Sequence, residues 1–255
     1  MKKDKALREF YEYWDGWHAK WQKLSHEQAV KDWKPIEKSF YYFPEPYWGK
    51  PLNDVKCIFI NINPGGEDDY QKLSWRDRDG NNSQLISTYL KHKKYSSCVR
   101  YLSFNKSYIT TNYFYNKRVK WFKEILEIEN SLDVNSFLFV DLIPWHTKNV
   151  NKEVITNINQ NKKEVIENLM RIFNIAVEQK CQIIAKGKPI IKILKSLGYH
   201  SPEAQINDGI FQISSFNILN FGVILHVISG GQGMNIPTNK AKINDRFKQI
   251  LTQHA

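Results

Sequence analysis

Apolar residues along the chain follow two patterns, one typical of helices and one typical of buried strands. Apolar residues at helical spacing, with charged residues between them, predict helices over 118–128, 163–179, 189–198 and 239–251. Short continuous apolar runs predict buried strands near Val55–Ile60 and within 136–146, 181–188 and 221–235. Strands that alternate with amphipathic helices are typical of a mostly parallel sheet. We therefore expect an α/β fold, a three-layer α/β/α sandwich around a mostly parallel central sheet.

The N-terminal region carries an aromatic stripe at helical spacing. Its members are Phe10, Trp14, Trp17, Trp21 and Leu24. Such a stripe is more typical of a helix packed across a core than of a ladder of ligand-stacking rings. The chain has no internal repeat and no obvious linker. We predict a single domain over residues 1–255, with an N-terminal helical extension over 1–45 and a core over about 50–240.

Charge and cysteine usage narrow the choice of partner and compartment. The chain has 37 Lys and Arg against 26 Asp and Glu, a net charge of +11, which suits nucleic acid or an anionic membrane, or serves solubility. It has no stretch of about 20 apolar residues and no signal-peptide core at its start. Three widely spaced cysteines exclude a four-cysteine iron–sulfur cluster and indicate buried thiols. We expect a cytoplasmic protein.

Polar segments stand at the ends of three of the predicted strands. They read "NINPGG" after the first, "DLIPWH" at the end of the second and "HVISGGQGMN" in the last. The carboxyl ends of parallel strands share one edge of a sheet, where ligands bind. We therefore expect Asn63, Asp141 and His226 to converge there, although they lie far apart in the chain.

Four segments, in this order, carry a resemblance to a known family: "INPGG", "FLFVDLIPWH", "IIAKGKP" and "HVISGGQGM". They resemble the motifs of the uracil-DNA glycosylase superfamily, in the branch whose first loop reads Asn-Pro-Gly. The last segment sits where the family has a His-Pro-Ser loop that enters the minor groove. The resemblance covers residues 50–240 and implies a DNA glycosylase, which flips a nucleobase out of DNA and hydrolyses its N-glycosidic bond.

The resemblance implies a role for several residues. Asn63 matches the residue that positions the attacking water, and His226 matches the one that donates to the base carbonyl as negative charge accumulates. The backbone amides of Gly65 and Gly66 approach a ligand closely because no side chain intervenes. Alternatively, His226 is a core histidine with a backbone partner. No metal or organic cofactor is implied, since water is the nucleophile.

Asp141 departs from the family pattern, which commonly has Asn at this position. An ionised Asp only accepts hydrogen bonds, which suits the exocyclic amine of cytosine or adenine rather than uracil. This favours cytosine or a modified cytosine as the target. Alternatively, Asp141 caps the turn that follows it.

The remaining candidates are loop residues and lysines. Ser229 and the run after it are candidates for DNA contact. Gln232 or Met234 could be a wedge for the space left by a flipped base, and the glycines, Gly231 among them, also fit a phosphate-binding turn. Three acidic residues follow the first loop: Glu67, Asp68 and Asp69. One of them acts as a general base near the attacking water, or they cap the next helix. Candidates for stacking or lining the pocket, or for plain packing, are Trp75, Tyr47, Trp48 and His146. Candidates for phosphate contacts are Lys186, Lys188, Lys240 and Lys242.

Other functions fit the sequence less well. Gly65 stands where an Asn-Pro-Pro-aromatic methyltransferase loop has its second proline, and no P-loop run is present. A catalytically inactive DNA- or partner-binding relative remains an alternative, because folds host many functions. Among glycosylases, repair of uracil or mismatches competes with antiviral defence against modified DNA. We expect a monomer that acts on DNA and not on a membrane.

Overall fold

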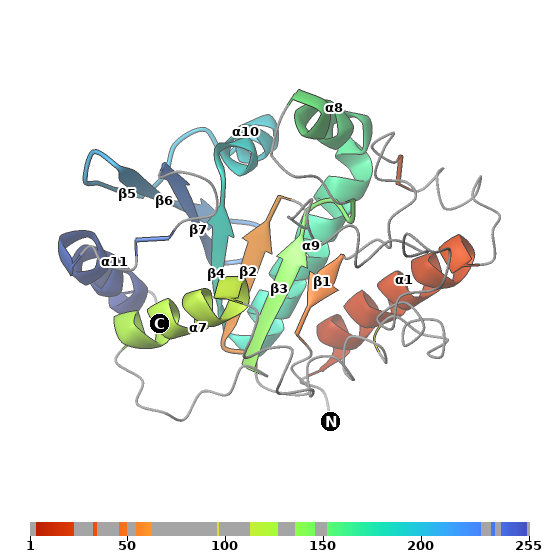
Figure 1. The fold of residues 1–255 in the computed structure, drawn as a ribbon, viewed down its shortest axis with the longest axis horizontal. Coiled ribbons are helices and arrows are strands. Elements are labelled where there is room, and N and C mark those ends of the chain that lie inside the picture. Colours follow the sequence, from red (N-terminus) through yellow and green to blue (C-terminus); the bar gives the residue numbers. More distant parts are fainter. Residues whose placement is uncertain are drawn as a thin grey trace, which may run out of the picture.

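The computed structural model of the 255-residue chain describes residues 4–22, 33–34, 46–49, 55–62, 96, 113–126, 136–145, 152–230, 236–237 and 241–253 (Figure 1). Within this part, one sheet of seven strands has the order β1-β3-β2-β4-β7-β6-β5. The strands are β1 (Tyr47–Trp48), β2 (Cys57–Asn61), β3 (Phe137–Asp141), β4 (Gln182–Lys186), β5 (Ala204–Asn207), β6 (Phe211–Ile218) and β7 (Val223–Gly230).

The four central strands, β3, β2, β4 and β7, are parallel. The outer strands are antiparallel: β1 to β3, β6 to β7 and β5 to β6. The predicted α/β fold with a mostly parallel centre is confirmed, but the sheet is mixed. The sequence patterns did not predict β5 or β6, and the Pro-rich segment around Tyr47 contributes a short strand rather than a loop alone.

The helices in the described residues are α1 (Lys5–Gln22), α7 (Tyr113–Leu126), α8 (Lys152–Gln160), α9 (Lys162–Gln179), α10 (Lys188–Ser196) and α11 (Ala241–Gln253). The four helices predicted within the core region are found with shifted ends, and α8 is an addition. None of the described helices has both the length and the apolar character needed to cross a bilayer.

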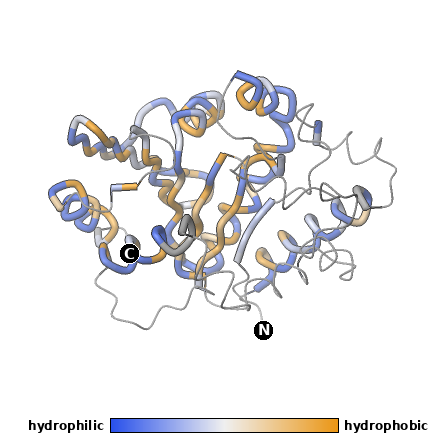
Figure 2. Tube along the Cα trace, in the orientation of Figure 1, coloured by the Kyte–Doolittle hydropathy of each residue, from blue (hydrophilic) through white to orange (hydrophobic). Residues whose placement is uncertain are grey.

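Helix α7 lies in front of the sheet in Figure 1 and α9 lies behind it. Phe122 of α7 meets Phe59 of β2 edge-on, with ring centroids 6.0 Å apart, and Phe59 stacks on Phe139 of β3 at 5.2 Å. Behind the sheet, Asn168 of α9 donates from Nδ2 to the Asp141 carbonyl at 3.4 Å. The central strands are hydrophobic along their length (Figure 2), as expected for strands covered on both faces.

Helix α1 packs on α9, and its aromatic stripe is buried against neighbouring aromatic rings. Phe10, Trp14 and Trp17 are buried, Trp14 stacks on Trp33 at 5.5 Å, and Trp17 meets Trp145 edge-on at 5.7 Å. The core-packing interpretation of the stripe is therefore confirmed for these three residues. The side chain of Trp21 and the whole of Leu24 lie outside the described residues.

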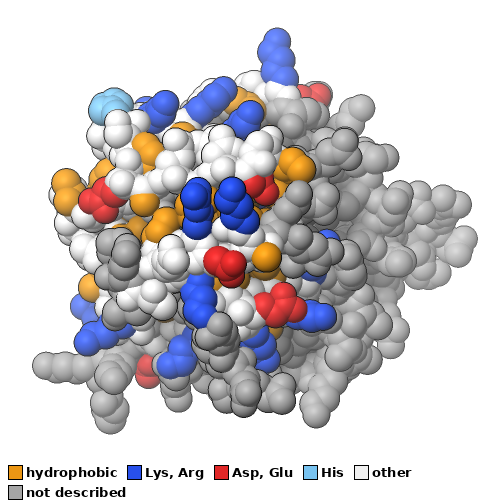
Figure 3. Space-filling view, turned by 90° about the vertical axis from the view of Figure 1, so that its left-hand side faces the viewer, with side chains coloured by type: hydrophobic (Ala, Val, Ile, Leu, Met, Phe, Trp, Pro, Cys, Tyr) orange, Lys and Arg blue, Asp and Glu red, His pale blue; other side chains and the backbone are white. Residues whose placement is uncertain are grey.

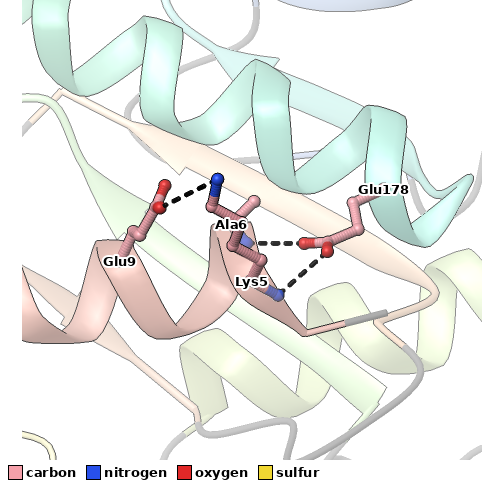
Figure 4. Close-up of polar contacts among 4 residues, drawn as sticks. All are labelled: Lys5, Ala6, Glu9 and Glu178. Atoms are coloured by element: carbon pink, nitrogen blue, oxygen red, sulfur yellow. Dashed lines mark hydrogen bonds and ion pairs between the residues drawn. The ribbon is translucent and has the colours of Figure 1, made fainter. Parts of the chain in front are cut away.

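A carboxylate of α9 fixes the first turn of α1 (Figure 4). The backbone N–H groups of Lys5 and Ala6 donate to Glu178 at 2.9 and 2.6 Å, while Lys5 Nζ lies 3.7 Å from Glu9. The first N–H groups of a helix have no partner within the helix, so this carboxylate satisfies two of them and complements the helix dipole.

Two of the three cysteines lie in the described part, at the start of the central strands. Cys57 is fully buried, and burial raises the pKa of its thiol well above the usual value. Burial likewise raises the pKa of the Cys181 thiol to about 12. Both thiols therefore stay protonated at neutral pH, in line with the predicted buried, unreactive cysteines.

Candidate functional site at the carboxyl edge of the sheet

The register of the parallel strands aligns their carboxyl ends in one row. Asn61 of β2 pairs with Asp141 of β3, and Ile60 pairs with Ala185 of β4, so the next residue, Lys186, stands beside Asn61. Lys186 in turn pairs with Ile228 of β7. The arrowheads of β2, β3 and β4 point the same way in Figure 1. The loops that follow these strands therefore start side by side.

Three polar side chains of this row project on the face that α7 covers. Phe59 contacts α7, and side chains alternate along a strand, so Asn61 projects on the same face. Paired residues on parallel neighbours share a face, which adds Asp141 and Lys186. Asp141 is 2% exposed and Asn61 is 7% exposed. The result is a sheltered row of a carboxylate, an amide and an ammonium on adjacent strands.

The pairing of β2 with β3 continues beyond the strands. The Leu142 N–H donates to the Asn61 carbonyl at 3.0 Å, and the Ile143 N–H donates to the Ile62 carbonyl at 3.1 Å. On the other side, the Asp141 N–H donates to the Pro46 carbonyl at 2.9 Å. Ile62 is therefore held beside the "LIPW" turn, with Asp141 between β2 and the segment that leads into β1.

Many of the predicted site residues lie outside the described residues. They are Asn63, Gly65, Gly66, Glu67, Asp68, Asp69, Trp75, His146, Gly231, Gln232, Met234 and Lys240.

His226 lies in the middle of β7, below the row. It pairs with Ile184, two residues before the level of Lys186 and Ile228, which is about 6.6 Å along a strand. Since β2 and β4 separate β7 from β3, His226 and Asp141 are also about 14 Å apart across the sheet. They project on the same face of the sheet, but His226 lies below the carboxyl edge and is not in contact with Asp141.

The imidazole of His226 is 0% exposed and has a side-chain partner. Its Nδ1 shares a hydrogen bond of 2.9 Å with Ser215 Oγ of β6, and the tautomer decides which group donates. The ring meets Phe247 of α11 edge-on at 5.1 Å. These contacts hold the imidazole in the core between β6 and α11, and the partner of its Nδ1 is the Ser215 hydroxyl.

The other described candidates occupy distinct places. Tyr47 pairs with Val140, so it projects on the face opposite Asp141, where it packs on Phe10 at 5.1 Å. Ser229 is 3% exposed within β7 and pairs with Gln212 of β6, so it belongs to the sheet rather than to the loop. Trp48 is 4% exposed and is packed likewise.

Gly230 ends β7 in a conformation that favours glycine, with φ of 86°. A Cβ there would collide with the Ile210 carbonyl of the neighbouring turn. Gly187, after β4, has φ of 124°, and a Cβ there would come within 2.5 Å of Ile62 Cδ1. Both glycines therefore serve close packing at the edge of the sheet.

Lysines are exposed next to the Gly187 turn. Lys188 opens α10, and Lys192 and Lys195 follow it at spacings of one and two turns, so the three form one exposed stripe. Lys242 is exposed on α11. On the face that Figure 3 shows, several Lys and Arg side chains gather along the upper part, and others lie among acidic and neutral ones.

Lys186 ends β4 and Arg118 is buried on α7, and only the lysine was among the residues predicted from the sequence. Lys186 Nζ donates to the Gly230 carbonyl at 2.6 Å and lies 5.4 Å from the ring centroid of Phe211. Burial, together with the Arg118 charge, lowers the pKa of Lys186 to about 8. Arg118 is 3% exposed on α7. Its position one turn before the inward Phe122 was the available signal that it faces the sheet.

Among the described residues, no three His, Cys, Asp or Glu side chains are grouped closely enough to hold a metal ion. The chain matches no protein-family model, and neither the curated proteins nor the solved structures compared with it give a significant match.

Proposed function

We propose that this protein is a DNA glycosylase related to the uracil-DNA glycosylase superfamily. It flips a nucleobase out of DNA and hydrolyses its N-glycosidic bond, leaving an abasic site. The proposal includes a three-layer α/β/α sandwich with an N-terminal helical extension, acting as a cytoplasmic monomer without a cofactor. The observation that carries it is the strand register, which starts the "NPGG", "LIPW" and "GGQGM" loops from one edge of the sheet.

The row at this edge suits the proposed chemistry. Asn63, two residues after the end of β2, positions the attacking water. Asp141, 2% exposed, accepts hydrogen bonds from the extruded base and selects one with an exocyclic amine. The target is then cytosine or a modified cytosine, as in defence against modified foreign DNA, with repair of uracil or mismatches as the alternative. The exposed lysine stripe that begins at Lys188 supports DNA as the partner.

The test is strand breakage after alkali. Purified protein is incubated with oligonucleotides and phage DNAs that carry cytosine, modified cytosines or uracil, and abasic sites are read as breaks. We expect breaks with the wild type and a loss of about 100-fold or more for Asn63→Ala. Asn174→Ala, an exposed asparagine of α9, is the matched control and keeps full activity. Folded wild type that cleaves none of these bases contradicts the proposal.

Asp141→Asn tests the choice of base. We expect the preference to move from the amine-bearing base toward uracil by about 10- to 100-fold, the usual worth of one good pair of hydrogen bonds to a base. An unchanged ranking of bases, with folding intact, removes the role given to Asp141 and leaves the glycosylase proposal standing.

The burial of His226 favours a second candidate, a catalytically inactive relative that binds DNA. Its imidazole is 0% exposed and is held by Ser215 and Phe247. If the protein is an active enzyme, His226→Gln lowers the rate of base excision by more than the loss of folded protein explains. In the inactive relative, DNA binds with the usual sensitivity to salt and no base is released from any substrate.

A further inference from the structure

Helix α10 carries exposed lysines on one side and buried apolar residues on the other. Lys188, Lys192 and Lys195 are exposed and lie within about 60° of one another around the helix axis. The buried residues of α10 project from the opposite side: Ile190, Ile193 and Leu194. Because the apolar side packs on the rest of the fold, these three lysines, the lysine stripe, face solvent.

The lysine stripe differs from exposed lysines on other helices because no carboxylate accompanies it. Lys5, Lys120 and Lys163 each form an ion pair with a glutamate four residues further along the same helix. None of residues 179–202 is Asp or Glu. Accordingly, none of the ion pairs found in the described part of the chain includes a lysine of the stripe. Its positive charge is therefore available to a ligand.

The stripe does not serve the stability of its own helix. Lys188 and Lys192 are four residues apart and Lys192 and Lys195 three, spacings at which like charges on a helix repel. Lys188 also stands in the first turn, where the helix dipole disfavours a positive charge and no acidic residue offsets it. Only Lys195, in the last turn, complements the dipole. A negatively charged ligand explains this pattern better than helix stability does.

The stripe starts at the candidate site. Only Gly187 separates Lys188 from Lys186, the lysine of the polar row. Helix α10 lies at the end of the sheet toward which the arrowheads of β2, β3 and β4 point (Figure 1). The Gly187 N–H donates to the Ile228 carbonyl at 2.9 Å, which fixes the start of the helix to β7. A polyanion on the stripe therefore passes beside the carboxyl edge of the sheet.

We infer that the lysine stripe binds the phosphate backbone of a DNA strand, which runs along α10 from the carboxyl edge of the sheet. The stripe spans about 10.5 Å of helix, and the phosphates of one strand of B-form DNA follow one another at about 3.4 Å along the duplex axis. The stripe thus matches about three successive phosphates. Lysines bind phosphates as point charges, so the contact is independent of base sequence. The inference rests on DNA as the partner in the proposed function and adds the surface that holds it.

The test compares two triple variants that remove the same charge. The stripe variant combines Lys188→Met, Lys192→Met and Lys195→Met. The control variant combines Lys5→Met, Lys120→Met and Lys163→Met, which are exposed but paired with glutamates. Met is a good helix former, and thermal unfolding shows that both variants are folded. Binding of a duplex oligonucleotide is measured by fluorescence anisotropy between about 50 and 200 mM salt.

We expect the stripe variant to bind the duplex about tenfold or more weakly than wild type at the lowest salt concentration. The slope of log affinity against log salt should fall by about 2 to 3, because each phosphate contact on B-form DNA contributes about 0.9. The control variant should stay within about threefold of wild type. Arginine at the three stripe positions should restore both the affinity and the slope, since it keeps the charge.

Acylation of lysines in the wild type, with and without the duplex, gives a second measurement that needs no variant. Bound DNA should protect the three lysines of the stripe and leave Lys163 as reactive as before. The inference is overturned if folded wild type does not bind the duplex or if the stripe variant binds as wild type does. Equal losses of affinity in the two triple variants, or equal protection of Lys163, also overturn it, because overall charge would then explain the binding.

Excision is scored in a separate reaction, so the two proposals can fail independently. If wild type releases bases while the stripe variant binds as wild type does, only the role of the stripe is lost. If no base is released but the stripe variant loses salt-sensitive binding, the stripe is supported and the glycosylase proposal fails.

Discussion

Ser215→Ala tests whether the buried imidazole of His226 depends on its hydroxyl partner. Ser215 is 2% exposed, His226 is 0% exposed, and their hydrogen bond measures 2.9 Å. Removing the hydroxyl takes a partner from Nδ1 where water does not reach, which costs about 1–3 kcal/mol of unfolding free energy. For a chain of this size, each kcal/mol lowers the melting temperature by about 2–4 °C.

The matched control is Ser196→Ala at the end of α10. Ser196 Oγ donates to the Ile193 carbonyl at 2.8 Å, but this carbonyl also accepts from the Leu197 N–H at 3.1 Å. Its loss therefore leaves no buried group without a partner and should cost less than about 0.5 kcal/mol.

Urea unfolding of wild type, Ser215→Ala and Ser196→Ala measures the two costs, and unchanged m-values show that the unfolded states are comparable. A double-mutant cycle with His226→Ala should give a coupling of about 0.5 kcal/mol or more between Ser215 and His226. If Ser215→Ala costs no more than Ser196→Ala, the hydroxyl does not hold the imidazole and the account of His226 as a fixed core residue is refuted.

Three further predictions concern stability. Burial lowers the pKa of His18 from 6.5 to about 4, so the folded state resists protonation. The free energy of unfolding should be constant above pH 6.5 and fall by about 3 kcal/mol in total as the pH drops to 4. His18→Leu should flatten that profile, and a slope as steep as in wild type would contradict the prediction. Glu178→Ala removes the acceptor for two N–H groups of α1 and should cost about 0.5–2 kcal/mol of unfolding free energy, measured by thermal unfolding. The control, Glu124→Ala, breaks the exposed ion pair with Lys120 and should cost less than about 0.5 kcal/mol. Equal costs would argue against Glu178 as a cap of α1. Gly230→Ala should lower the free energy of unfolding in urea clearly more than Gly209→Ala does. Both glycines have φ near 86°, but of the two only a Cβ at 230 meets a neighbouring carbonyl. Similar losses of unfolding free energy would mean that the turn around Ile210 shifts to make room.

The sequence predicted the elements whose environment is simple. Strands β2, β3 and β4 are buried on both faces, so they appear as continuous apolar runs. Strand β6 and helix α8, whose apolar patterns contain buried polar residues, were missed. Strand β6 contains Ser214 and Ser215, both buried, which interrupt its apolar run. Such residues are stabilised by partners on other elements, as Ser215 is by His226 of β7, and the apolar pattern of one strand does not identify the partner.

Helix α8 was missed for the same reason. Its Asn157 is 2% exposed, and its Nδ2 donates to the Lys34 carbonyl at 2.7 Å. Asn161, which precedes α9, reaches the same segment: its Oδ1 accepts from the Lys34 N–H at 2.6 Å. These asparagines fasten residues 33–34 to the helices, so they read as polar in the sequence although they lie in the interior.

The candidate site was likewise predictable only in part. That several polar segments leave one edge of the sheet could be predicted, because parallel strands share their direction. The position of each side chain along its strand, relative to the carboxyl edge, could not be predicted, because an apolar run does not show where strand pairing ends. His226 therefore lies two residues below the row of Asp141, Asn61 and Lys186. Arg118 was missed because it comes from α7, and only the packing of that helix brings it to the sheet.

The row has opposite charges at its two ends, and a nucleotide has a corresponding polarity. Under the proposed function, Asp141 accepts hydrogen bonds from the base at β3, whereas Lys186 places a cation at the end of β4. A nucleotide likewise carries the donors and acceptors of its base at one end and its anionic phosphate at the other. If one nucleotide spans the row, Asp141→Asn changes the ranking of bases and does not change the salt dependence of DNA binding. Lys186→Met then lowers the salt dependence of DNA binding and does not change the ranking of bases. A double variant then shows the two effects added, because the residues stand about 10 Å apart and contact different parts of the ligand.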